Sequence, residues 1–305
     1  MSIVNEKLSG LLEQLSQLEE KRLFFVGGFV KSGTTWVERI LDAHPEVICK
    51  GEAHFGSLLE PALRDALATY NTLIPKKGNW ARHRREGERG ASVARYSYMS
   101  TDMDVLYARA IQLMLLKWRD AGEARCIGEK TPNNSEYFER FQKLFPDARF
   151  LYVVRDVRDV AVSGWFFNLT VDSKRTLETF RDINEYAVYI AGSWTSHVAA
   201  GLRFVEQNSG LAACVKYEDL HGAPIEEASR LFKFLGTDTD ERTVGRCIAS
   251  VDFSRLSGGR ARGTENRSSF YRKGIVGDWS NHLGTRTISA MESRAGGLMD
   301  RLGYE

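Results

Sequence analysis

The stretch from Leu23 to Trp36 reads LFFVGGFVKSGTTW and decides the interpretation of the chain. Its first four residues are an apolar run that ends at Gly27-Gly28, which is typical of a buried strand entering a tight loop. The loop follows the pattern G-x-x-x-x-G-T-T, and residues 34–43 predict a helix directly after it. In such a loop, backbone N–H groups and the helix N-terminus face an anion. The stretch therefore predicts a phosphate-binding loop.

One position of this loop departs from the loop of nucleoside-triphosphate-binding proteins. Thr34 stands where those proteins require a lysine, and Lys31 lies inside the loop instead. A surface lysine in an ordinary strand-to-helix turn is the alternative interpretation. The order of strand, glycines, hydroxyl residues and helix favours the phosphate-binding one. The loop residues expected to face the anion are Lys31, Ser32, Gly33, Thr34 and Thr35.

The alternation of strands and helices continues along the chain. Further strands are expected near residues 125–128, 150–154 and 212–216, and helices near 102–119, 135–145, 157–167, 180–207, 224–235, 240–250 and 285–302. Strands that alternate with helices form a parallel sheet covered on both faces. We therefore expect an α/β fold in which residues 1–305 form a single three-layer domain around a parallel sheet of about five strands.

Three segments do not belong to this alternation. Residues 1–20 predict an amphipathic helix, which we expect to pack on its own domain rather than on a partner. Residues 71–100 and 254–277 predict long loops, which in compact domains tend to be lids or binding segments. The basic stretch 82–89 either contacts an acidic or sugar ligand or is a solvated part of its loop.

Composition narrows the class of protein. Lys and Arg number 42 against 40 Asp and Glu, so the net charge of +2 gives no reason to expect a nucleic-acid partner. No apolar run approaches the length of a membrane span, and the first residues do not resemble a secretory signal. The four cysteines are far apart and show no metal-ligand spacing. We expect a reduced, cytoplasmic protein without a metal site.

Two further segments carry cations where an anion could bind. Residues 152–163 read YVVRDVRDVAVS, so that Arg155 follows a strand and Ser163 comes eight residues later. Open α/β sheets bind ligands at the carboxyl ends of their strands, although Arg155 could also simply pair with a neighbouring aspartate. Residues 272–282 read RKGIVGDWSNH, and two cations before a glycine suit a phosphate held by side chains and backbone N–H groups together.

Together the three segments resemble those of the sulfotransferases that use 3′-phosphoadenosine 5′-phosphosulfate (PAPS). Residues 30–36, VKSGTTW, are similar to that family's P-K-S-G-T-T-W, with Val30 in place of the proline. Residues 272–281 resemble its R-K-G-x-x-G-D-W-x-N, and residues 217–220 its Y-E-D-L. The resemblance implies in-line transfer of a sulfuryl group from PAPS to a hydroxyl of a small-molecule, lipid or carbohydrate acceptor, leaving 3′,5′-adenosine bisphosphate (PAP).

The resemblance also implies roles for residues of the donor site. Lys31 and the loop residues would hold the 5′ side of the donor. The 3′-phosphate would be held by Arg155, Ser163, Arg272, Lys273 and Gly274. Trp36, Tyr217 and Phe253 would contact the adenine, although Phe253 could equally be a core residue.

The base that accepts the proton of the hydroxyl is less clearly marked. The small-molecule branch of the family uses a histidine in K-T-H-x-P, but residues 129–133 here read EKTPN. Residues 50–55, KGEAHF, loosely resemble the K-E-x-H-F stretch of the carbohydrate branch, which implies Glu52 as the base and His54 as the second choice. Both could instead be surface residues. Lys31 would stabilise the leaving group, Lys130 would be a second cation on the sulfuryl oxygens, and Ser163 would restrain Lys31.

Two other questions stay open at this stage. A P-loop kinase and an inactive PAP-binding module are the alternative functions. For assembly, the cytosolic branch pairs through K-x-x-x-T-V-x-x-x-E, but Leu283 stands in place of the lysine and only residues 287–292 match. We therefore expect a monomer or a differently built dimer.

Overall fold

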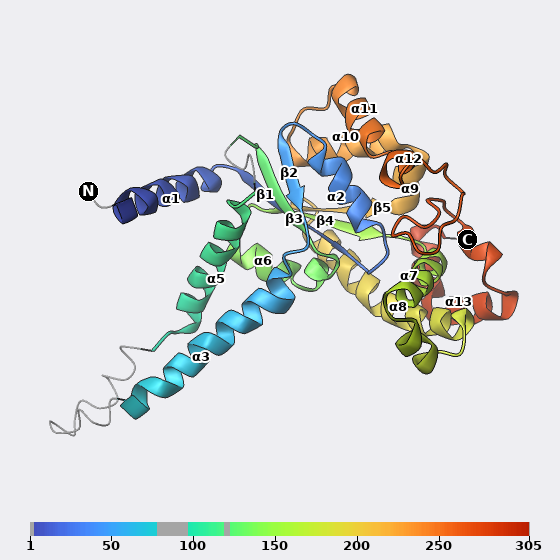
Figure 1. Ribbon diagram of the computed structural model, residues 1–305, viewed down its shortest axis with the longest axis horizontal. Coiled ribbons are helices and arrows are strands. Elements are labelled where there is room, and N and C mark those ends of the chain that lie inside the picture. The colour runs from blue at the N-terminus through green and yellow to red at the C-terminus, as the bar shows by residue number, and fades with distance from the viewer. Residues whose placement is uncertain (1–2, 78–96, 119–122, 305) are drawn as a thin grey trace.

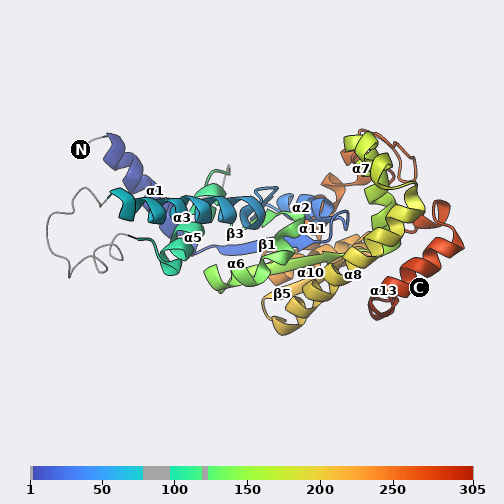
Figure 2. The ribbon, with the colours of Figure 1, turned by 90° about the horizontal axis from the view of Figure 1, so that it is seen from below.

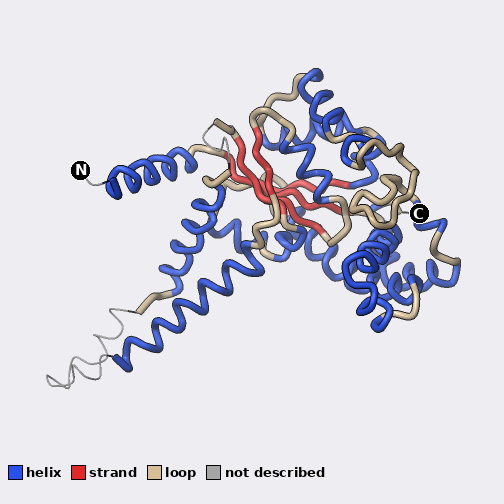
Figure 3. Tube along the Cα trace, viewed as in Figure 1, coloured by secondary structure: helices blue, strands red, loops and turns tan. Residues whose placement is uncertain are grey.

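A five-stranded parallel sheet forms the centre of the protein. The computed structural model describes residues 3–77, 97–118 and 123–304. The strands are β1 Arg22–Gly28, β2 Val47–Lys50, β3 Cys126–Lys130, β4 Arg149–Val154 and β5 Ala212–Lys216. Their order is β2-β3-β1-β4-β5, so the strand that leads into the phosphate-binding loop lies in the middle (Figure 3). Open parallel sheets bind ligands where the strand order reverses, which here is the carboxyl end of β1.

Helices cover both faces of the sheet, because neighbouring residues of each strand point to opposite faces. Phe24 belongs to the core under α2, α10 and α11, whereas Phe25 belongs to the larger core under α5 to α8 and α13 (Figures 1 and 2). The helices are α1 Ile3–Glu19, α2 Thr34–Asp42, α3 Glu60–Lys77, α5 Ser100–Leu115, α6 Phe138–Leu144, α7 Val157–Thr179, α8 Ile183–Gln207, α9 Tyr217–Gly222, α10 Pro224–Leu235, α11 Glu241–Ser250, α12 Phe253–Leu256 and α13 Thr285–Leu302. The predicted three-layer α/β arrangement is confirmed.

Several predicted boundaries are wrong. The predicted loop 71–100 is helical at both ends, because α3 continues to Lys77 and α5 begins at Ser100, while residues 78–96 with the basic stretch lie outside the described residues. The helix predicted for 157–167 extends to Thr179. Residues 257–277 form neither helix nor strand, and only the first three positions of the predicted loop 254–277 are helical.

The N-terminal helix forms as predicted and packs on its own domain in part. Leu18 is buried, whereas Leu8 and Leu12 are 52% and 58% exposed. Figure 1 shows α1 projecting from the sheet, and its end is held to α5 by an ion pair of 2.6 Å between Glu19 and Arg109. The apolar stripe therefore contacts its own domain only at its last turn.

Candidate functional site

The phosphate-binding loop connects β1 to the N-terminus of α2. Lys31 and Gly33 take the left-handed backbone conformation, with φ of 66° and 96°. A Cβ atom on Gly33 would lie 2.4 Å from the Tyr217 ring, so this position requires glycine for space as well as for conformation. The Ser32 hydroxyl is fully buried, and Thr34 begins the helix. The loop thus lies at the carboxyl end of β1, and the N-terminus of α2 follows it directly.

Arg155 and the segment from Arg272 to Gly274 meet at the start of α7. The carboxylate of Asp159 accepts hydrogen bonds from the backbone N–H groups of Gly277 and Trp279, at 2.9 and 3.1 Å. The same carboxylate pairs with Arg155 at 3.3 Å. The predicted pairing of Arg155 with an aspartate is therefore present, but it also ties two distant segments together. Pairing of Arg155 with an aspartate is therefore compatible with binding of an anion by Arg155.

The cations Arg272 and Lys273 share one buried carboxylate. The Lys273 ammonium lies 2.5 Å from Asp278, and Arg272 contacts the other oxygen of the same group. Burial acts to raise the pKa of Asp278, but the hydrogen bonds from Lys273 and Arg272 outweigh burial and hold that pKa well below its ordinary value. Arg272 also pairs with Glu265 at 2.5 Å, so two carboxylates hold these two cations in place beside the pocket.

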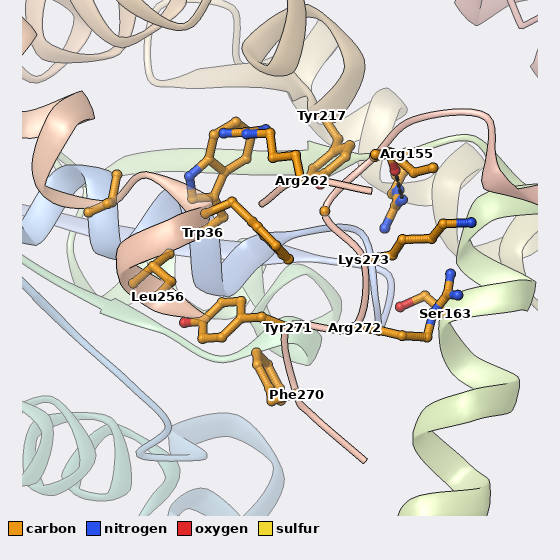
Figure 4. Close-up of a pocket in the computed structure, with 14 residues that line it drawn as sticks. Trp36, Arg155, Ser163, Tyr217, Leu256, Arg262, Phe270, Tyr271, Arg272 and Lys273 are labelled. Atoms are coloured by element: carbon orange, nitrogen blue, oxygen red, sulfur yellow. Dashed lines mark hydrogen bonds between the residues drawn. The ribbon is translucent and has the colours of Figure 1, made fainter. Parts of the chain in front are cut away.

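These segments line one pocket with the predicted adenine-binding aromatic residues (Figure 4). Its predicted members are Trp36, Arg155, Ser163, Tyr217, Phe253, Arg272, Lys273 and Gly274. Trp36 and Tyr217 meet edge to face at 5.5 Å, and Phe253 is buried against Gly274, where a Cβ would lie 2.3 Å from the ring. Phe253 is therefore a buried residue that also lines the pocket, and its contact with adenine stays a prediction.

Sequence reasoning missed several residues of this pocket. Arg262, Leu256, Phe270 and Tyr271 also line it. All four lie in or beside the predicted loop 254–277, so the available signal was the density of arginine and aromatic residues in a segment assigned a binding role. No spacing rule selects individual positions there.

Two buried polar groups at this site are suited to bind an anionic ligand. Among the described residues, the hydroxyl oxygen of Ser32 and the Nε of Arg155 have no hydrogen-bond partner. Buried donors normally have partners, and an unsatisfied donor is costly. Both groups can donate to the oxygens of a phosphate or sulfate. The residues present therefore fit a nucleotide that carries such groups.

Lys31 lines a neighbouring cavity, and Ser163, Phe270 and Arg272 line both that cavity and the pocket. Its ammonium sits over the rings of Phe167 and Phe270, at 3.8 and 4.8 Å from their centres. Burial, followed by the charge of Arg155, lowers the pKa of Lys31 to about 8. The structure contains no hydrogen bond between Lys31 and Ser163, both of which are described, so the restraint implied for Ser163 is not seen in this state.

A buried lysine joins the loop to the candidate base. Lys130 is 3% exposed, and its ammonium lies 2.6 Å from Glu52, 3.2 Å from the Thr35 hydroxyl and 3.3 Å from Glu38. Burial raises the pKa of Glu38, and the charge of Lys130 opposes that shift. Sequence reasoning selected Lys130 and Glu52 but not Glu38, which lies on the buried face of α2 and belongs to none of the quoted motifs.

The side chains of Glu52 and His54 lie close together in a segment that is neither helix nor strand, and His54 takes the left-handed backbone conformation with φ of 51°. The two side chains approach to 3.6 Å between a carboxylate oxygen of Glu52 and Nε2 of His54. The intervening Ala53 donates its N–H to the buried carboxylate of Glu129 at 2.8 Å, and that carboxylate also accepts from Thr131 and Asn134, each at 2.6 Å. Burial raises the pKa of Glu129, whereas these hydrogen bonds lower it. Glu129 therefore fixes the backbone that carries both candidate bases.

Among the residues that the structure describes, no group of three or more His, Cys, Asp or Glu side chains is placed to hold a metal ion. No helix within residues 3–77, 97–118 and 123–304 is long and apolar enough to cross a bilayer.

Comparison with known sequences points to one family. A family model described as "Sulfotransferase family" matches residues 24–241. Sulfotransferase 1C2 of Homo sapiens is 28% identical over 149 residues, which cover 45% of this chain and 50% of the human protein. Cytosolic sulfotransferase 1 of Arabidopsis thaliana is 27% identical over 150 residues, which cover 44% of this chain and 45% of the plant protein. The chain spans about half the length of these relatives.

Solved structures share the fold. The crystal structure of mouse sulfotransferase SULT7A1 complexed with PAP superposes with a TM-score of 0.57 at 16% identity, covering 94% of this chain and 88% of the mouse chain. That of sulfotransferase STF9 from Mycobacterium avium gives a TM-score of 0.51 at 15% identity, covering 97% and 81% of the two chains.

Proposed function

The chain belongs to the sulfotransferase family, and from that premise we propose that it transfers a sulfuryl group from PAPS to a hydroxyl group, releasing PAP. One observation carries the proposal: residues from three separate segments, among them Trp36, Arg155 and Lys273, line a single pocket at the carboxyl ends of the strands. When bound, PAPS supplies the sulfuryl group that is transferred. All further steps depend on what the side chains of this chain do.

The proposed donor contacts divide the site into three parts. The loop residues 31–35 bind the 5′ side. Arg155, Ser163, Arg272, Lys273 and Gly274 bind the 3′-phosphate, and Trp36, Tyr217 and Phe253 contact the adenine. Positioning and charge stabilisation are the contributions expected of the protein in such a transfer. Lys31 stabilises the negative charge of the leaving group, Lys130 neutralises the sulfuryl oxygens, and Glu52 or His54 accepts the proton of the hydroxyl.

The acceptor is proposed only as a hydroxyl compound of the small-molecule, lipid or carbohydrate class. We propose a cytoplasmic location, because the four cysteines are unpaired and relatives such as the plant protein above are named cytosolic. A screen of sugars, phenols, sterols and lipids with radiolabelled PAPS tests the function directly. Thermal stabilisation by PAP, but not by ATP with magnesium, is expected. Stabilisation by ATP alone would favour the kinase alternative, and PAP binding without turnover would favour an inactive module.

Replacement of Arg155 by alanine tests the 3′-phosphate site. The substitution removes a charge-assisted contact worth roughly 1.5–3 kcal/mol, so we expect PAP affinity to fall about tenfold to a hundredfold. Isothermal titration calorimetry with PAP measures this change. Arg255, which is exposed on α12 and does not line the pocket, offers the matched control. If Arg155→Ala binds PAP as tightly as the parent, the assignment is wrong.

Light scattering is expected to show a monomer or a dimer that does not pair through residues 283–292. The segment that matches half of the family's pairing motif packs inward, because Thr287 is buried with its hydroxyl 2.8 Å from Asn184 and Ile288 packs against the core. Leu283 is buried as well. A dimer that Ile288→Glu dissociates, with the thermal stability of the protein retained, would contradict the expectation.

A further inference from the structure

Arg262 lies over the Trp36 ring beside the pocket and belongs to none of the three motifs. Its guanidinium carbon lies 5.7 Å from the centre of the Trp36 ring, and Figure 4 shows the side chain reaching over the indole. The residue also lines the pocket. Trp36 is one of the aromatic residues proposed to hold the base, so Arg262 stands opposite a proposed base-binding surface.

The backbone on both sides of Arg262 is tied to the segment that carries the phosphate-binding cations. The Arg260 guanidinium donates to the carbonyl oxygen of Arg272 at 3.0 Å, and Gly263 donates its N–H to the carbonyl of Lys273 at 2.9 Å. These bonds fix the turn above the pocket. Arg262 therefore projects from a defined position relative to the 3′-phosphate site.

The Arg262 side chain itself is only weakly held. It is 37% exposed, and its ion pair with Asp252 is long, at 3.8 Å. An ion pair of that length and exposure contributes little to stability. A change of rotamer can therefore move the guanidinium without moving the turn.

The spacing indicates what Arg262 does. A planar base held between two flat groups needs about 7 Å between them, since each stacking contact spans about 3.5 Å. The observed 5.7 Å is short of that by an amount that side-chain rotation can supply. A guanidinium is planar and stacks on aromatic faces, whereas an ammonium does not. Arg155, Arg272 and Lys273 already supply the phosphate contacts from the other end of the pocket.

We propose that Arg262 forms the outer wall of the base-binding part of this site, and that its guanidinium stacks on the adenine that Trp36 contacts from the other side. The inference rests on the proposed function, because it presupposes that the pocket takes an adenine nucleotide. It adds a residue from the irregular loop to the set that recognises the base.

Calorimetric titration of the full chain with two ligands tests the proposal. The first ligand is PAP, and the second is ribose 3,5-bisphosphate, which retains both phosphates but lacks the base. Arg262→Ala should weaken PAP binding by about threefold to thirtyfold, as expected for a cation stacked on a partly desolvated ring. Binding of the ribose bisphosphate should stay within about twofold of the parent. Arg262→Lys should resemble Arg262→Ala, and Arg255→Ala should match the parent.

Each other outcome has a separate meaning. Equal losses for both ligands would make Arg262 a phosphate ligand and overturn the proposal. Unchanged PAP binding by Arg262→Ala would also overturn the proposal. Tighter PAP binding would overturn it too, because the arginine side chain would then compete with the base. If the parent protein binds neither PAP nor the ribose bisphosphate, the proposed function itself is wrong, whatever the role of Arg262. The exposed position of Arg262 makes a folding defect easy to recognise, since the ligand-free thermal midpoint should not change.

Discussion

Lys31→Ala should lower turnover by about 100-fold to 1000-fold while PAP affinity changes only a few-fold. The expected size is that of removing one preorganised donor from a site where negative charge develops. An interaction that forms mainly in the transition state affects turnover rather than binding. The lysine already lies beside the pocket, with its ammonium against Phe167 and Phe270. Single-turnover transfer from radiolabelled PAPS to an acceptor found in the screen measures the rate, and calorimetry measures PAP affinity.

The control is Lys50→Ala, which removes an exposed lysine that pairs with Asp42 at 2.5 Å and does not line the pocket. It should change neither quantity. An equal loss of turnover and PAP affinity in Lys31→Ala would instead make Lys31 a ground-state phosphate ligand.

The pH dependence gives an independent measurement on the parent protein. Burial lowers the pKa of Lys31 to about 8, so its ammonium is charged below that pH and loses its charge as the pH rises through it. The value of kcat/KM for PAPS reports groups of the free enzyme and should therefore fall above about pH 8. The fall in kcat should come at higher pH, because a bound anion favours the charged lysine. A flat kcat/KM profile up to about pH 10 would contradict a role for the Lys31 charge.

The sequence predicts the parts of this molecule that depend on short-range patterns. The apolar run that ends at Gly27-Gly28 predicts a buried strand, and Phe24 and Phe25 of that strand do lie in the cores on opposite faces. The phosphate-binding loop is a local structure set by glycines and by the start of a helix. The order of strands and helices was enough for the layer arrangement.

Contacts between distant segments could not be predicted in this way. The hydrogen bonds from Gly277 and Trp279 to Asp159 join positions more than a hundred residues apart, and no local pattern marks them. In the sequence, Glu38 resembles any charged residue of an amphipathic helix. Only the fold shows that Lys130 lies beside it. The apolar stripe of α1 is largely exposed, which the sequence did not predict. Periodicity indicates a helix with one apolar face, but it does not indicate what that face contacts.

The loop around Phe270 could be predicted only in part. Its length and composition marked residues 254–277 as a binding segment, yet individual roles depend on backbone turns that place Phe270 over Lys31 and Arg262 over Trp36. Such turns require several glycines with positive φ, including Gly258, Gly259 and Gly263. Glycines are visible in a sequence, but the direction in which each turn sends the chain is not.

Glu52→Gln should lower turnover by about 100-fold or more while PAP affinity stays nearly unchanged, because general-base removal affects only the proton-transfer step. Glutamine keeps the shape of the side chain and still accepts a hydrogen bond from Lys130, which lies 2.6 Å from Glu52. The substitution therefore removes the base without displacing the second cation. The same single-turnover assay, paired with PAP titration, measures both quantities.

His54 is the internal comparison, since its imidazole lies 3.6 Å from the Glu52 carboxylate. If Glu52 accepts the proton directly, His54→Ala should reduce turnover much less than Glu52→Gln, and the double variant should resemble Glu52→Gln alone. If His54 is the base, the order reverses, and Glu52→Gln retains near-parental turnover while His54→Ala is inactive. The backbone favours neither result, because Glu129 holds Ala53 and thereby positions both neighbours equally. What favours Glu52 is its contact with Lys130, since that lysine is the cation proposed to meet the sulfuryl oxygens, and a base beside it is placed where the hydroxyl must approach.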